Sequence, residues 1–128
     1  MSMLRVLVVD DEVPNLRTFQ RVYRKHYDIE MASTGSAGLR LLAEREFDVV
    51  VLDFGMPQMS GAEFVASARY VQPVAIVMVT GYMTHPDVLE LEASREIFAL
   101  VGKPWDRDAL VDVVARASDH TRSLRSPS

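Results

Sequence analysis

The chain has 128 residues, of which 48% are hydrophobic and 25% charged, and its formal net charge is −4. This length and composition are typical of one soluble globular domain and exclude an intrinsically disordered chain. The mild negative charge gives no general attraction to nucleic acid or anionic lipid, the lack of cysteine excludes disulfides, and no apolar run reaches the roughly 18 residues that span a bilayer. We therefore expect a cytoplasmic protein that does not itself bind nucleic acid or membranes.

Apolar runs alternate with segments of helical periodicity along the whole chain. The expected strands cover residues 5–10, 28–32, 48–53, 74–80 and 97–101. The expected helices cover residues 14–23, 35–45 and 61–70, a segment that begins at Pro86, and residues 107–120. The positions expected to face the core are Leu16, Phe19, Val22 and Tyr23 in the first helix, Leu39, Leu42 and Ala43 in the second, Phe64, Val65 and Ala68 in the third, and Leu110, Val113, Val114 and Ala117 in the last.

This alternation predicts an α/β fold. Continuously apolar strands separated by helices are typical of a parallel sheet that helices cover on both faces. The segment 28–32 alternates polar and apolar residues, which favours an edge strand. We therefore expect a doubly wound, flavodoxin-like sheet of five parallel strands in the order 2-1-3-4-5. Residues 1–121 form the predicted domain, and residues 122–128 form a flexible tail or the start of a linker.

Polar residues stand where the predicted strands end. Asp10 and Asp11 end the first strand, Asp53 ends the third, Thr80 ends the fourth, and Lys103 follows the fifth. Because the carboxyl ends of parallel strands share one edge of the sheet, these side chains should lie close together. A single Asp or Thr at a strand end is usually a turn former, but a turn-forming role does not explain five such residues at one edge.

Three carboxylates in one cleft repel one another unless a proton or a cation joins them, and an all-oxygen site suits Mg²⁺, with Mn²⁺ as an alternative. An ammonium and a hydroxyl opposite the metal would complete a site for a phosphoryl group. Asp53, at the centre, is the candidate nucleophile, and it would form an aspartyl phosphate.

Four segments, VVDDE, LDFGMPQMSG, VMVTG and GKPWD, closely resemble the signature segments of the receiver domain of two-component response regulators. The resemblance extends from about residue 4 to residue 120. It implies that Asp53 accepts a phosphoryl group from a phosphohistidine of a sensor kinase or a histidine phosphotransfer protein. It also implies that Asp11 binds Mg²⁺ directly, that Asp10 binds it through water, and that the backbone carbonyl of Gly55 is a further ligand.

The same resemblance assigns roles on the other side of the site. Lys103 would bind a phosphoryl oxygen, and the bond between Lys103 and Pro104 would be cis. The Thr80 hydroxyl would move toward another phosphoryl oxygen and pull the loop that begins at Gly81. The surface formed by the helix that begins at Pro86, the strand at 97–101 and the helix at 107–120 would then change, and it is also a possible homodimer interface.

The sequence departs from the usual pattern of this family in two respects. Leu100 stands three residues before the lysine, where such domains usually carry an aromatic side chain that rotates with the threonine, so we expect signalling by loop movement or oligomerisation. Gly55 brings no side chain to the site, whereas Tyr82 is bulky. We expect Tyr82 to cover the phosphoryl group partly and to set its lifetime.

The predicted function is thus a phosphorylatable switch, free-standing or joined to a C-terminal output domain. Such a switch catalyses its own phosphorylation and dephosphorylation, and turnover of an external substrate is not expected. Two alternative functions are also compatible with these residues. One is a receiver-like interaction module that phosphorylation does not regulate, and the other is a Mg²⁺-dependent phosphatase, which usually needs a general acid where this chain has Gly55.

Overall fold

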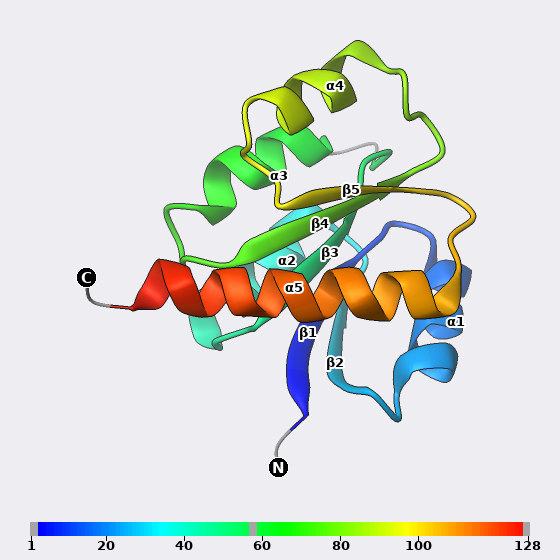
Figure 1. Cartoon of the computed structure of the whole chain (residues 1–128), viewed down its shortest axis with the longest axis vertical. Coiled ribbons are helices and arrows are strands. Elements are labelled where there is room, and N and C mark those ends of the chain that lie inside the picture. The colour runs from blue at the N-terminus through cyan, green and yellow to red at the C-terminus, as the bar shows by residue number, and fades with distance from the viewer. Residues whose placement is uncertain (1–2, 57–58, 127–128) are drawn as a thin grey trace.

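The computed structural model describes residues 3–56 and 59–126, which form a five-stranded sheet flanked by helices (Figure 1). The strands are β1 (Leu4–Val9), β2 (Tyr27–Ala32), β3 (Val49–Asp53), β4 (Ala75–Thr80) and β5 (Ala99–Gly102). The helices are α1 (Val13–Tyr23), α2 (Gly35–Glu44), α3 (Gly61–Ala68), α4 (Pro86–Ala93) and α5 (Arg107–Arg125).

The sheet has the predicted topology. Its strand order is β2-β1-β3-β4-β5, and each pair of neighbours is parallel. In register, Val9 of β1 lies beside Leu52 of β3, and Asp53 lies beside Val79 of β4. From β1 the chain adds β2 on one side of the sheet and then β3 on the other, so the order of strand addition reverses at β1. The carboxyl ends of β1 and β3 therefore form the crevice in which doubly wound sheets bind ligands.

Two hydrophobic clusters hold the helices on opposite faces of the sheet. On one face, Phe19 of α1 and Leu110 of α5 pack against the valines of β1, β3 and β4. On the other face, Leu42 of α2, Phe64 of α3 and Leu91 of α4 pack against the alternate side chains of the same strands. The two layers are visible in Figure 1, where α5 crosses the near side of the sheet and α2 lies behind it. All five residues of β3 are buried, which makes β3 a rigid support for Asp53.

Two positions that the sequence predicts to be inward-facing are exposed. Val22 in α1 is 37% exposed, and Ala43 in α2 is also exposed. In α1 the buried stripe runs through Leu16, Phe19 and Tyr23, at the spacing of one helix face. Val22 lies beside this stripe rather than within it, and its side chain lines a cavity at the end of the helix.

The last helix is longer than the sequence predicts. The composition of residues 122–128 favours a flexible tail, but α5 continues to Arg125. The side chain of Arg125 donates hydrogen bonds to the carbonyl oxygens of Pro73 and Phe47 and to the side-chain oxygen of Gln72. These bonds between segments far apart in sequence fix the last turn of the helix, and a composition-based prediction does not detect them. The last two residues of the predicted tail, 127 and 128, lie outside the described residues.

Thr121 connects the same helix to the sheet. Its side chain is fully buried, and its hydroxyl accepts a hydrogen bond of 2.8 Å from the backbone N–H of Ala75 and donates one to the carbonyl of Ala117. Ala75 is the first residue of β4, so this hydroxyl satisfies a buried donor where the strand begins.

We predict that Thr121→Val lowers the free energy of unfolding by about 1–3 kcal/mol, because the valine has the same shape but leaves the Ala75 N–H without an acceptor. Urea denaturation followed by circular dichroism measures this change. The matched variant Thr121→Ser keeps the hydroxyl and should lose less than half as much stability. Equal losses in the two variants would show that the methyl group, and not the hydrogen bond, matters at this position.

Candidate functional site

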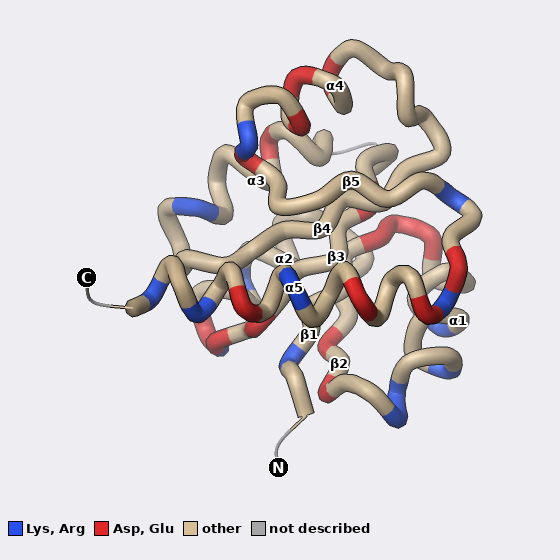
Figure 2. Tube along the Cα trace, in the orientation of Figure 1, with Lys and Arg blue, Asp and Glu red and all other residues tan. Residues whose placement is uncertain are grey.

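The polar residues at the strand ends meet at one edge of the sheet. Asp10 and Asp11 follow β1 directly, Asp53 and Thr80 are the last residues of β3 and β4, and Lys103 follows β5. Figure 2 shows the acidic stretch where the chain leaves β1 for α1, next to the ends of the central strands. The strand topology therefore brings together all five side chains that the sequence singles out.

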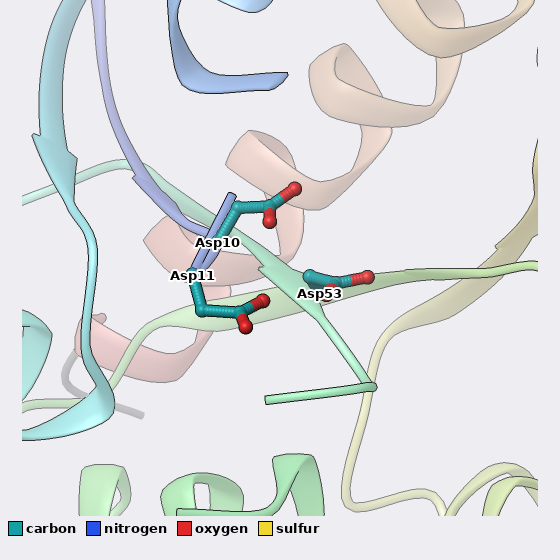
Figure 3. Close-up of side chains that lie close together, drawn as sticks. All are labelled: Asp10, Asp11 and Asp53. Carbon is teal, nitrogen blue, oxygen red and sulfur yellow. The ribbon is translucent and has the colours of Figure 1, made fainter. Parts of the chain in front are cut away.

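Three carboxylates form the centre of the site. Asp10, Asp11 and Asp53 each offer an oxygen atom, and these three oxygens lie within 4.8 Å of one another. Figure 3 shows the three side chains extending to the same side, with Asp10 and Asp11 on the segment after β1 and Asp53 at the end of β3. Asp10 and Asp53 are only 6% and 9% exposed, so their mutual repulsion is weakly screened by water.

The carboxylate of Asp10 is held in place by two neighbours that the sequence analysis misses. The backbone N–H of Glu12 donates to Asp10 Oδ1 at 2.9 Å, and the side-chain amide of Asn15 donates to Asp10 Oδ2 at 3.3 Å. The same Asn15 amide donates to the Glu12 carboxylate at 2.9 Å. The position of Asn15 in the first turn of α1, just after the acidic pair, is the only feature of the sequence that points to this role.

The ionisation of Asp10 reflects its crowded position. Burial is the main cause that raises the pKa of Asp10 above its ordinary value of 3.8, and the charge of Asp53 raises it further. The hydrogen bonds from Glu12 and Asn15 and the charge of Lys103 act in the opposite direction without cancelling the rise. The ionised form of Asp10 is thus disfavoured by the folded protein, and a cation placed among the three carboxylates would relieve this cost.

Lys103 supplies the positive charge of the site. Its Nζ atom donates a hydrogen bond of 2.8 Å to Asp53 Oδ1. Burial opposes the charged form, but the hydrogen bond to Asp53 and the nearby negative charges outweigh it and raise the pKa of the ammonium above its ordinary 10.5. The bond from Lys103 to Pro104 is cis, as predicted.

Beside these charges lies a hollow of about 270 Å³. Its lining consists of Asp11, Glu12, Asp53, Gly55, Thr80, Gly81, Tyr82 and Lys103. The Thr80 side chain is 1% exposed, and its hydroxyl accepts a hydrogen bond of 2.9 Å from the backbone N–H of Tyr82. The ring of Tyr82 is 65% exposed, so it stands at the border of the hollow rather than closing it.

Gly55 and Leu100, whose residue types are unusual for these positions, differ in their relation to the hollow. Gly55 lines it, and a Cβ atom at this position would lie 3.8 Å from Asp53 Oδ2. Leu100 is outside the hollow. It pairs in register with Met78 of β4 and packs, half-buried, against the core on the α3 and α4 side. Pro57 and Gln58, which belong to the LDFGMPQMSG segment, lie outside the described residues.

The arrangement suits a small, highly charged ligand. Carboxylate oxygens on one side can hold a divalent cation, and an ammonium and a hydroxyl on the other can bind the oxygens of a tetrahedral anion.

None of the helices in residues 3–56 and 59–126 has the combination of length and apolar character that crossing a membrane requires.

Comparison with known proteins agrees with this geometry. Transcriptional regulatory protein GlrR of Escherichia coli (strain K12) is 29% identical over 118 residues, which cover 91% of this chain and 26% of that protein. A probable cyclic di-GMP phosphodiesterase of Vibrio cholerae is 29% identical over 132 residues, which cover 98% of this chain and 28% of that protein. The chain spans less than half the length of these curated relatives.

The fold also matches solved structures. The signal receiver domain of an HD domain-containing protein from Pseudomonas fluorescens Pf-5 has a TM-score of 0.83 and 30% identity, and the match covers 98% of this chain and 93% of that chain. Residues 6–115 match the family described as the response regulator receiver domain. Together with the five-stranded fold and the acidic site, this match shows that the chain belongs to the family of response regulator receiver domains.

Proposed function

We propose that this domain is a phosphorylatable switch in which Asp53 accepts a phosphoryl group from a phosphohistidine of a sensor kinase or a histidine phosphotransfer protein. The observation that carries the proposal is the contact of Lys103 Nζ with Asp53 Oδ1 at 2.8 Å, next to two further carboxylates. An aspartate mounted on a buried strand, bonded to the Lys103 ammonium and facing a hollow that this lysine also lines, is positioned to act as a nucleophile.

The three carboxylates also fit a resident Mg²⁺ ion. Their oxygens lie close enough to share one cation, and oxygen ligands are those that Mg²⁺ prefers. We assign the protein ligands to Asp11, to Asp53 and to the Gly55 carbonyl, with Asp10 acting through water. When bound, the ion would neutralise charge on the transferred phosphoryl group.

The residues of the chain divide the remaining work. A carboxylate oxygen of Asp53 attacks phosphorus, the P–N bond to the donor imidazole breaks, and the imidazole nitrogen keeps the electron pair. Lys103 binds an equatorial phosphoryl oxygen and so stabilises the charge of the transition state. The Thr80 hydroxyl, which now accepts from the Tyr82 N–H, turns to donate to another phosphoryl oxygen and draws the Gly81–Tyr82 segment with it.

The output and partners of the switch follow from the same proposal. The relatives include a transcriptional regulator and a probable phosphodiesterase, which suggests that receivers of this kind serve different output domains. We propose that residues 1–121 are the receiver, that residues 122–128 begin a linker, and that the protein works in the cytoplasm. The responding surface would be α4, β5 and α5, where homodimerisation is also possible.

We predict that incubation with Mg²⁺ and acetyl phosphate adds one phosphate to the protein, and that Asp53→Asn abolishes the adduct because the nucleophile is lost. Intact-protein mass spectrometry measures the adduct. The control Asp112→Asn removes an exposed carboxylate on α5 and should leave it unchanged. An adduct of equal yield in Asp53→Asn would mean that another residue is the acceptor.

Asp10 yields a prediction about stability. Its folded pKa is raised, so the folded protein binds this proton more tightly than the unfolded chain does, and stability falls as the pH rises from about 3.8 through the folded pKa. The raised pKa of Asp10 therefore makes the folded protein less stable at pH 7 than it would be with an unshifted carboxyl group. Asp10→Asn should raise the melting temperature by a few degrees in EDTA and reduce the further gain on adding Mg²⁺. A lower melting temperature in EDTA would contradict this explanation.

Tyr82 yields a prediction about lifetime. Because its ring borders the hollow that contains Asp53, it should hinder the water that hydrolyses the aspartyl phosphate. Tyr82→Ala should speed the decay of the phosphorylated form severalfold, as followed by the loss of the phosphate adduct with time. Tyr70→Ala removes a ring that is 82% exposed and does not line the hollow, so its decay rate should match that of the unsubstituted protein. Unchanged decay in Tyr82→Ala would remove Tyr82 from this role.

Leu100 yields a prediction about the readout. A leucine has no aromatic ring that could rotate between two positions, and the half-buried side chain of Leu100 packs against the core. Structures with and without beryllofluoride should differ in the segment after Thr80 or in oligomeric state. A difference confined to the side chain at position 100 would be evidence against this readout.

A further inference from the structure

A second cavity lies beside the acidic site and shares Asp10, Asp53 and Lys103 with it. Its volume is about 530 Å³, within the range of small-molecule sites. It lies between α1 and the segment that joins β5 to α5, on the face of the sheet that these two helices cover. The wall includes Val22, whose partial exposure is explained by this opening in the packing.

Most of the cavity wall is hydrocarbon. Phe19 and Tyr23 of α1 face it from one side, Trp105 from another, and valines of β1, β3 and β4 form its floor. The indole N–H of Trp105 already has an acceptor, since it donates to the Tyr23 hydroxyl at 2.9 Å. A wall with few free hydrogen-bonding groups favours an apolar, flat molecule over water.

Two cations and two carboxylates line the wall, and of the two cations only Lys103 has an acidic partner. Lys103 is paired with Asp53, and Asp10 accepts from the Glu12 N–H and from Asn15. The Nη2 atom of Arg107 lies 3.0 Å from His26 Nε2, and no carboxylate within the described residues forms a salt bridge with this arginine.

The position of Arg107 in its helix also leaves its positive charge uncompensated. It is the first residue of α5, and a helix dipole does not stabilise a cation at its amino-terminal end. The neighbouring Asp106 is engaged as the cap of the helix, since its carboxylate accepts from the Ala109 N–H. A guanidinium that can form two parallel hydrogen bonds is therefore available at the cavity, and its usual partner is a planar carboxylate.

We propose that this cavity binds a small aromatic carboxylate, with the rings between Phe19, Tyr23 and Trp105 and the acid group on Arg107. The cavity shares Asp10, Asp53 and Lys103 with the acidic site, but its occupancy requires neither Mg²⁺ nor phosphorylation of Asp53. Failure of the phosphorylation proposal would therefore leave this one standing, and the reverse is also true.

The chain offers a direct reporter for the test. Trp105 is the only tryptophan, so its indole N–H gives a single cross-peak in a ¹H–¹⁵N spectrum of the labelled protein. We expect titration with 2-naphthoate to shift this cross-peak to saturation, with a dissociation constant on the order of 1 mM or below for a ligand of this size. The neutral analogue 2-naphthylmethanol should bind about tenfold more weakly because it cannot form the charge-assisted pair.

Three variants locate the binding. Arg107→Gln should remove the preference for the acid over the alcohol, whereas Arg116→Gln, on the same helix but outside the cavity, should keep it. Thr18→Phe places a ring in the cavity wall and should weaken both probes. No saturable shift of the Trp105 cross-peak, equal affinity for the two probes, or unchanged binding in Thr18→Phe would each overturn the proposal.

Discussion

The ion pair between Lys103 and Asp53, set against the other two carboxylates, is the interaction on which the functional site depends. Three acidic groups whose oxygens lie within 4.8 Å of one another would repel strongly at a half-buried edge. One ammonium at 2.8 Å offsets part of that repulsion, and its own pKa rises as a result. The site thus retains an unbalanced negative charge, which is the electrostatic condition for attracting a divalent cation.

This charge is held at the end of a fully buried strand. β3 is buried over its whole length, and its neighbours β1 and β4 pack against helices on both faces. The backbone therefore cannot relax to separate the carboxylates. Asp10 is fixed further by the Glu12 N–H and by Asn15. A site that is strained electrostatically and rigid mechanically favours ligand binding as the way to lower its energy.

The two hollows next to Asp53 differ in chemistry and therefore in what they can bind. The smaller one is lined by charged and small residues and borders the Thr80–Tyr82 segment, which is suited to a phosphoryl group. The larger one is lined by aromatic and aliphatic side chains with Arg107 at its wall. Asp53 and Lys103 contribute to both, so a molecule in the larger cavity would lie next to the residues that handle the phosphoryl group.

The sequence by itself determined the sheet, its strand order and the five polar residues at its edge. It could do so because hydrophobic periodicity and the position of a residue after a strand are local properties, and parallel strands carry their carboxyl ends to one side. The tertiary structure decided what depends on contacts between distant segments. The hydrogen bonds that Arg125 donates to Pro73, Phe47 and Gln72 extend α5 beyond its predicted end. The hydrogen bond from Asn15 to Asp10 likewise forms only when α1 packs next to the end of β1. The cavity beside Trp105 forms only when α1 packs next to the β5–α5 segment. No local sequence pattern predicts either packing.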